Sequence, residues 1–308
     1  MRITPLLALA CLACLATLPA HAAPATHEIP MWMQGGHPTV AVQLGDRVEP
    51  LHFVIDSAAG ATVMDQATAR RLGLDDPDAA GVEVEGATDS SAVLRRTRST
   101  RWQVGTLSFE AATMQTDLSR LGKDGRRIDG ILGNDVTDRF DTTFDIAGQR
   151  VLLQPPGRMP AGPGCVPNAV PVRDASMQRF GFIPVQLGAP AVEAIAVVDT
   201  GAAQTVLNSA AASALGLRTD GSDARVRVRE QGTRGLGERV METWLATLPG
   251  LRMGGWQHPA LEVRISELPV FASLGLKERP ALILGADAMG DTQVQVGSGA
   301  AWICLRRG

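Results

Sequence analysis

Short runs of alternating apolar and polar residues recur along the chain, and this period of two is typical of β-strands. Thr39 to Leu44 alternates, and Phe182 to Leu187 does so in part. Hairpins are predicted over 82–94, around the turn at Gly86 to Ser91, and over 143–153, and a looser hairpin starts with the strand 224–229 and includes Gly232, Gly235 and Gly237.

Helical segments are expected to be few and short. Asp65 to Leu72 and Ser209 to Leu215 fit one or two helical turns, and each is followed by a glycine, Gly73 or Gly216, that can end a helix. Asp135 and Asp287 are predicted to cap two further short helices.

The chain contains an internal duplication with an offset of 143 residues. The segment 42–74 aligns without gaps on 185–217, with 14 identities in 33 positions. Asp56 falls on Asp199, and each follows an apolar, largely β-branched run that predicts a buried strand.

A second pair of matching segments follows later in each half. Ile131, Leu132 and Gly133 match Ile283, Leu284 and Gly285 at an offset of 152. The second half therefore carries nine more residues between its two motifs, and we expect these residues to lengthen a surface loop.

The first 22 residues are typical of a secretory signal peptide. Arg2 precedes the apolar run Leu6 to Leu18, and Ala20-His21-Ala22 forms a cleavage site. The run is too short for a stable membrane anchor. A lipoprotein at Cys11 or Cys14 is disfavoured because the residues before them fit an acylation site badly. We expect a periplasmic or secreted protein whose mature chain divides into lobes over 23–160 and 161–308.

Composition changes this picture little. The chain has 308 residues, 45% of them hydrophobic, and a net charge of −3, so a large core is expected and nucleic acid is not an expected partner. Two cysteines remain after the signal peptide, Cys165 and Cys304. A disulfide between them is favoured in an oxidising compartment, and two buried thiols are the alternative.

An acid at the end of a buried strand is costly unless it finds partners. If the duplication brings Asp56 and Asp199 together, the two carboxyls can share one proton, because close negative charges resist joint ionisation. The neutral acid can then protonate a carbonyl oxygen while the charged one deprotonates a water.

The motifs resemble those of aspartic proteases of the retropepsin and pepsin type. Asp199-Thr200-Gly201-Ala202 matches the family motif fully, Asp56-Ser57-Ala58-Ala59 matches with one departure, and each is followed by Ile-Leu-Gly. The resemblance covers essentially the whole mature chain and implies an all-β fold of two pseudo-symmetric lobes with a cleft between them.

The resemblance also implies a role for each matching residue. Asp56 and Asp199 would be the catalytic pair, and Ser57 and Thr200 would brace the two loops, together with Ala58 and Gly201. The supporting segments behind the loops would be Ile131, Leu132, Gly133, Ile283, Leu284 and Gly285. The hairpin over 82–94 would be a flap over an extended peptide substrate.

Three departures from the family pattern stand out. Ala58 replaces a glycine, the chain contains no tyrosine for a pepsin-type flap, and Asn134 and Ala286 stand where the family often has arginine. The sequence therefore predicts an aspartic endopeptidase, with a catalytically weak or inactive peptide-binding protein of the same fold as the alternative. A monomer suffices because each half brings its own aspartate.

Other enzyme classes lack their motifs. The histidines at 27, 37, 52 and 258 form no His-x-x-x-His pair, so no metal site is expected. The sequence contains neither a Gly-x-Ser-x-Gly nucleophile motif nor a Gly-Lys-Ser/Thr phosphate loop, and no cofactor is expected. The arginines 95, 96 and 98 are interpreted as a solvated cluster.

Overall fold

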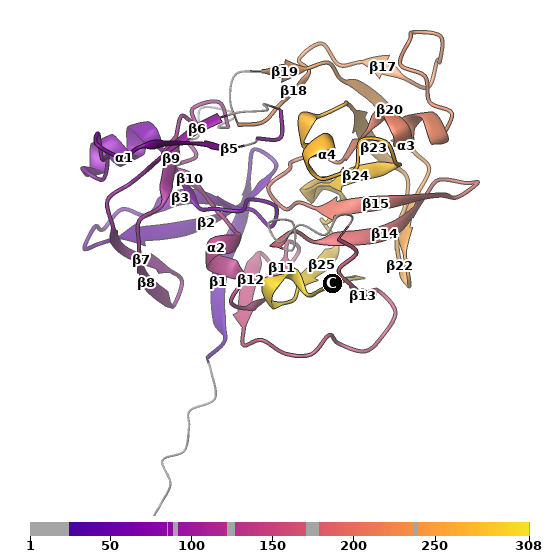
Figure 1. The fold of residues 1–308 in the computed structure, drawn as a ribbon. Coiled ribbons are helices and arrows are strands. Elements are labelled where there is room, and N and C mark those ends of the chain that lie inside the picture. Colours follow the sequence, from indigo (N-terminus) through magenta and orange to yellow (C-terminus); the bar gives the residue numbers. More distant parts are fainter. Residues whose placement is uncertain are drawn as a thin grey trace, which may run out of the picture.

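The structure is a computed structural model that describes residues 25–84, 86–88, 92–121, 127–170, 179–236 and 239–307. These residues form mostly β-strands in two lobes that lie side by side, one indigo to magenta and the other orange to yellow (Figure 1). The predicted all-β, two-lobed fold is confirmed. The signal peptide predicted over 1–22 lies outside the described residues.

The N-terminal lobe is formed by consecutive short strands, among which the predicted strand at 39–44 and the hairpin at 82–94 are confirmed. Its strands are β2 (His37–Leu44), β3 (Leu51–Ile55), β4 (Val63–Asp65), β5 (Gly81–Val84), β6 (Ala92–Arg96), β7 (Thr100–Val104), β8 (Leu107–Ala111), β9 (Met114–Thr116) and β10 (Gly130–Leu132).

The C-terminal lobe repeats this plan. Its strands are β14 (Phe182–Leu187), β15 (Val192–Val198), β16 (Val206–Leu207), β17 (Arg227–Val228), β18 (Thr233–Arg234), β19 (Val240–Met241), β20 (Trp244–Leu248), β21 (Leu251–Met253), β22 (Trp256–His258), β23 (Leu261–Ile265) and β24 (Ala281–Leu284).

A sheet built from both halves of the chain joins the lobes at the lower centre of Figure 1. Its strands, in spatial order, are β13 (Cys165–Pro167), β26 (Trp302–Arg307), β25 (Thr292–Val296), β11 (Asp141–Asp145), β12 (Arg150–Gln154) and β1 (His27–Gln34). The antiparallel β11–β12 pair is the hairpin predicted over 143–153. The β11–β25 pair links the two halves directly.

Each lobe contains the same three-strand unit at its centre. In the N-terminal lobe, β10 lies between β3, which is parallel to it, and β4, which is antiparallel. In the C-terminal lobe, β24 lies between β15 and β16 with the same two directions. The duplication seen in the sequence is therefore a duplication of this unit.

The helices are short, as expected. They are α1 (Gln66–Leu72), α2 (Asn134–Thr137), α3 (Ser209–Ala214), α4 (Pro269–Ser273) and the 3-10 helices η2 (Ala286–Ala288) and η3 (Ser298–Ala300). Asp65 caps α1 by accepting from the Thr68 N–H, and Gly73 ends it with a left-handed φ of 70°.

The looser hairpin predicted in the second half is present, but with other strands. Only Arg227–Val228 of the predicted strand at 224–229 forms β17, and it pairs with β20. The hairpin itself is β18–β19, which approaches the β5–β6 hairpin of the other lobe at the top of Figure 1. The Gly235 N–H donates to Thr88 Oγ1 at 3.1 Å across this approach.

Most of the nine extra residues of the second half lie near this second hairpin. Arg96 pairs with Met114 on β9, and Leu245 pairs with Arg264 on β23. β9 lies beside β4 as β23 lies beside β16, so β9 and β23 are equivalent strands. Arg96 therefore corresponds to Leu245. The two residues are 149 positions apart in sequence, whereas the first motifs of the two halves are 143 apart. Six of the nine residues therefore precede β20, in the segment that carries β18–β19.

The two remaining cysteines form a disulfide, as favoured above. Cys165 on β13 and Cys304 on β26 face each other in register, 139 residues apart in sequence. The bond closes most of the C-terminal lobe into one covalent loop. No helix among the described residues is both long and apolar enough to cross a membrane.

We predict that the double substitution Cys165→Ser/Cys304→Ser lowers the free energy of unfolding by about 2–4 kcal/mol, because a cross-link across a long loop restricts the unfolded chain. Urea unfolding of both proteins measures the difference. A reductant should destabilise the original protein to the same extent and leave the double variant unaffected. Equal midpoints for the two oxidised proteins would contradict this role.

Candidate active site

The two aspartates singled out by the duplication lie next to each other between the lobes. Each follows the last residue of a buried strand, Asp56 after β3 and Asp199 after β15. Their carboxyls are close enough for each to shift the pKa of the other. The segments on which they sit are 143 residues apart in sequence and meet only in the folded chain.

Backbone N–H groups hold each carboxyl in place. The Ala58 N–H donates to Asp56 Oδ1 at 2.7 Å, and the Ala202 N–H donates to Asp199 Oδ1 at 2.8 Å. The two loops are thus near copies of each other, and each directs one carboxyl toward the interface between the lobes.

Both aspartates have raised pKa values. Burial raises the pKa of Asp56, although hydrogen bonds from Ala58, Asp199 and Ala59 oppose the shift. Burial also raises the pKa of Asp199 well above its usual range, and the charge of Asp56 raises it further. Part of each residue remains accessible to solvent. Two close carboxyls with raised pKa values resist joint ionisation, so they titrate as a pair.

Four reciprocal hydrogen bonds lock the two loops together. The Ser57 N–H donates to Thr200 Oγ1 and the Thr200 N–H donates to Ser57 Oγ, both at 3.0 Å. The Thr200 hydroxyl donates to Ile55 O and the Ser57 hydroxyl donates to Val198 O, both at 2.9 Å. Ser57 and Thr200 are buried, so each lobe satisfies polar groups of the other.

Gly201 allows the closest approach in the site. A Cβ atom added there would lie 2.2 Å from Asp56 Oδ2, so no side chain fits beside the first carboxyl. Ala58 holds the corresponding position in the first loop, where the fold accommodates a methyl group. The two halves of the site therefore have similar backbones but differ by the methyl group of Ala58.

The Ile-Leu-Gly segments run directly beside β3 and β15, the strands that Asp56 and Asp199 follow. Ile131 and Leu132 pair with β3, and the Asp56 N–H donates to Leu132 O at 3.0 Å. Ile283 and Leu284 pair with β15, and the Asp199 N–H donates to Leu284 O at 3.1 Å.

The glycines that end these segments are required by close packing. A Cβ atom on Gly133 would lie 2.6 Å from Ala61 O, and one on Gly285 would lie 2.6 Å from the Gln204 carbonyl carbon. The backbone of each supporting segment thus lies directly against its catalytic loop.

Asp135 and Asp287 do not cap helices, contrary to the prediction. Gly133 and Gly285 are the residues at these caps, and neither helix receives a side-chain cap. Asp135 instead accepts from the Thr62 hydroxyl at 2.7 Å, and Asp287 accepts from the Thr205 hydroxyl at 2.7 Å. Thr62 and Thr205 lie six residues after Asp56 and Asp199. Asp135 and Asp287 therefore anchor the far ends of the loops that begin at Asp56 and Asp199.

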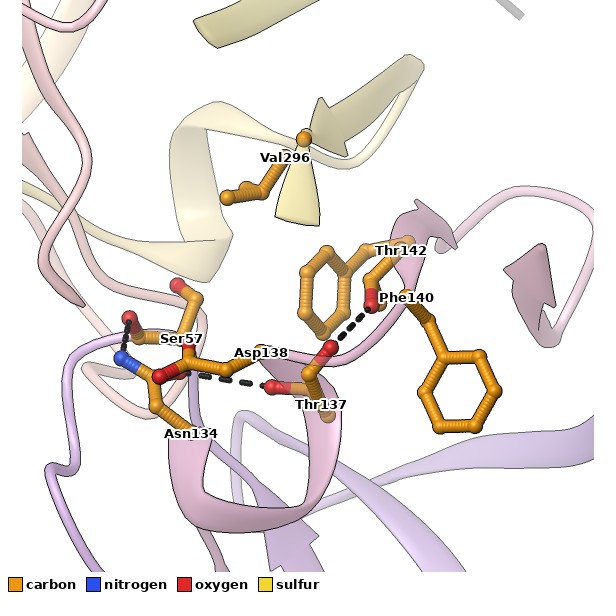
Figure 2. A pocket seen from close by; sticks show the side chains of 9 residues that line it. Ser57, Asn134, Thr137, Asp138, Phe140, Thr142 and Val296 are labelled. Carbon is orange, nitrogen blue, oxygen red and sulfur yellow. Dashed lines mark hydrogen bonds between the residues drawn. The ribbon is translucent and has the colours of Figure 1, made fainter. Parts of the chain in front are cut away.

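Asn134 takes over part of the bracing at the position where the family often has arginine. Its side-chain amide donates to Ser57 O at 3.0 Å and to Arg179 O at 2.8 Å, and so joins the two halves. Figure 2 shows Asn134 and Ser57 in a small pocket behind the loop, lined also by Thr137, Asp138, Phe140, Thr142, Phe144, Val296 and Gly297.

A further contact, missed in the sequence, comes from the turn between β1 and β2. His37 Nδ1 lies 2.7 Å from Gly201 O, and Gly36 lies against Ala203. The N-terminal lobe thus directly contacts the loop that begins at Asp199. In the sequence, Thr62-Val63 and Thr205-Val206 match across the duplication and so gave a signal for the two threonines, and the family pattern marked the position of Asn134. Nothing in the sequence marked His37 as part of the site.

The fold and this pair of braced aspartates define a two-lobed acid protease architecture. A family model described as "Aspartyl protease" matches residues 40–136 and again residues 184–288, and the chain belongs to this family. No curated protein matches the chain significantly. Within the described ranges, no three His, Cys, Asp or Glu side chains gather closely enough to hold a metal ion.

The reciprocal lock yields a stability prediction. Thr200→Val keeps the shape of the side chain but leaves the Ser57 N–H and Ile55 O without partners, and each buried unpaired group costs about 1–3 kcal/mol. We expect a loss of about 2–4 kcal/mol in the free energy of unfolding, measured with urea. Thr247→Val, on an exposed position of β20, is the matched control and should change stability by less than about 0.5 kcal/mol.

The raised pKa of Asp199 yields a prediction about pH. The folded protein binds its proton more tightly than the unfolded chain, so ionisation of Asp199 destabilises the fold as pH rises above about 4. Asp199→Asn should therefore be more stable than the original protein at pH 7, and this advantage should vanish below pH 4. Thermal unfolding across this range tests it, with exposed Asp78→Asn as control. A constant difference at all pH values would contradict the shift.

Proposed function

We propose that the protein is an aspartic endopeptidase that hydrolyses peptide bonds through Asp56 and Asp199. The position of the two buried carboxyls carries this proposal: Asp56 Oδ2 lies against Gly201, two residues after Asp199, and each acid affects the pKa of the other. Membership of the aspartyl protease family supports a protease function. The reciprocal lock between Ser57 and Thr200 adds support, because it holds both acids in fixed positions.

In the proposed reaction, the pair carries one proton and binds a water molecule between its carboxyls. The Asp56 carboxylate removes a proton from the water as its oxygen attacks the peptide carbonyl carbon, while Asp199 donates its proton to the carbonyl oxygen. The tetrahedral intermediate then collapses: Asp199 takes back a proton from one of its two hydroxyls as the carbonyl re-forms, the C–N bond breaks, and Asp56 gives its proton to the leaving nitrogen. No covalent intermediate with the enzyme forms, and the pair is again singly protonated.

The substrate would be an extended peptide lying beneath the two hairpins, β5–β6 and β18–β19. These hairpins come from opposite lobes and meet through the Gly235–Thr88 hydrogen bond, so a peptide must displace or pass beneath them. Extended peptides bind such hairpins by main-chain hydrogen bonds, and side-chain pockets then give specificity. A monomer would complete the site because both aspartates belong to one chain.

The proposed location is the periplasm or the exterior of the cell, after removal of residues 1–22. The disulfide is compatible with such an oxidising compartment. The division into lobes at residues 160 and 161 stays a prediction. It falls in the connection between β12 and β13.

One observation favours a second candidate, a peptide-binding protein with weak or no turnover. Ala58 places a methyl group in the first catalytic loop, where the second loop has Gly201. If that methyl tilts Asp56, the cleft would still bind peptides while the water would be poorly placed. The enzyme is favoured because the hydrogen bonds around Asp56 match those around Asp199.

We predict that Asp56→Asn and Asp199→Asn each reduce cleavage of an unfolded protein substrate such as casein by about 10²- to 10⁴-fold, because each removes one partner in proton transfer. Pepstatin, an inhibitor of aspartic proteases, should block the original protein. Ala58→Gly should preserve or raise turnover, whereas Gly201→Ala should abolish it because its methyl overlaps the Asp56 carboxyl. Cleavage that persists in both asparagine variants would remove the catalytic assignment.

A further inference from the structure

An arginine on β23 lies between the loop that carries Asp199 and the β18–β19 hairpin. Arg264 Nε donates to Gln204 Oε1 at 2.8 Å, and its Nη1 donates to Thr233 Oγ1 at 3.3 Å. Gln204 is five residues after Asp199, and Thr233 is on β18. The guanidinium therefore links the segment that follows Asp199 to the β18–β19 hairpin, beneath which the proposed substrate would lie.

Among the described residues Arg264 forms no ion pair, although the charge of the more distant Asp287 acts on it and raises its pKa. Its hydrogen-bond partners are the neutral Gln204 and Thr233, and no described carboxylate lies within ion-pair distance of it. Burial lowers the pKa of Arg264 to about 10, with a further contribution from the charge of Arg229. It stays charged at neutral pH, so a partly buried cation is left without an ion pair, which costs free energy until an anion approaches.

The N-terminal lobe has no such charge at the equivalent place. Val63 pairs with Met114 just as Val206 pairs with Arg264, and the duplication places Val63 on Val206. Met114 therefore corresponds to Arg264, and Ala61 corresponds to Gln204. One side of the cleft is apolar at this position and the other is cationic, although the backbone is the same.

We propose that Arg264, with Arg229 nearby, forms a subsite that binds an acidic side chain, Asp or Glu, of the peptide substrate on the Asp199 side of the cleft. This inference rests on the proposed function. A guanidinium has five N–H donors, and the three hydrogen bonds to Gln204 and Thr233 leave two for a carboxylate. Charge-assisted hydrogen bonds of this kind are among the strongest that proteins form.

The test uses pairs of short fluorogenic peptides that differ only by Glu or Gln at one position, scanned across the residues flanking the cleaved bond. At about pH 6 the glutamate is ionised. The original protein should cleave one Glu peptide with a kcat/KM about 10- to 100-fold above that of its Gln partner. Arg264→Gln and Arg264→Met, the latter copying the N-terminal lobe, should bring this ratio close to one.

Arg252→Gln is the matched control. Arg252 is exposed on β21, toward the edge of the C-terminal sheet and away from the flap, so its loss should leave the Glu/Gln ratio unchanged. Thermal unfolding of each variant checks that the fold is intact. A ratio near one in the original protein, or a ratio that survives in both Arg264 variants, would overturn the subsite.

The two proposals fail in distinguishable ways. If the original protein cleaves both peptides at equal rates, the endopeptidase stands and the acidic subsite is overturned. If it cleaves neither, the endopeptidase is contradicted, and binding of the same peptides by fluorescence anisotropy then decides the subsite. Tighter binding of the Glu peptide, lost in Arg264→Gln, supports it, and equal binding overturns it.

Discussion

The reciprocal hydrogen bonds between Ser57 and Thr200 are the interaction on which the rest of the site depends. They are buried, they run in both directions between the lobes, and each partner satisfies a backbone group of the other lobe. Two carboxyls that repel each other when ionised need such an external restraint to stay together. Each loop is held by its supporting strand and by Asp135 or Asp287. The hydrogen bonds between Ser57 and Thr200 then fix the distance between the two loops.

The duplication gives two backbones of the same shape, and substitutions then make the two sides different. Gly201 lets Asp56 lie against the backbone, while Ala58 carries a methyl group at the matching place. Arg264 and Gln204 line one side, while Met114 and Ala61 hold the equivalent positions on the other. A peptide has direction and a varied sequence, so an asymmetric cleft within one chain can discriminate among side chains in a way that a symmetric one cannot.

Much of the fold could be predicted because the relevant signals are local or repeated. Alternation identified the hairpins at 82–94 and 143–153, and glycines marked the ends of α1 and α3. The prediction that Asp135 and Asp287 cap helices was wrong, because each side chain bonds a threonine far away in sequence instead of its own helix. The sequence marked Asn134 only as a departure from the family pattern and could not give its role, since its partners Ser57 and Arg179 lie on other segments.

The sequence by itself determined that two equivalent acids end two equivalent strands, because a duplication and the period of a strand can be read along the chain. Only the tertiary structure decided that both acids have raised pKa values, because burial and the distance between two carboxyls arise when separate segments pack together. It also decided that Arg264 lies against Gln204 and Thr233 and forms no ion pair with a described carboxylate. The sequence gives the charge of a side chain, but the tertiary structure determines which residues lie next to it.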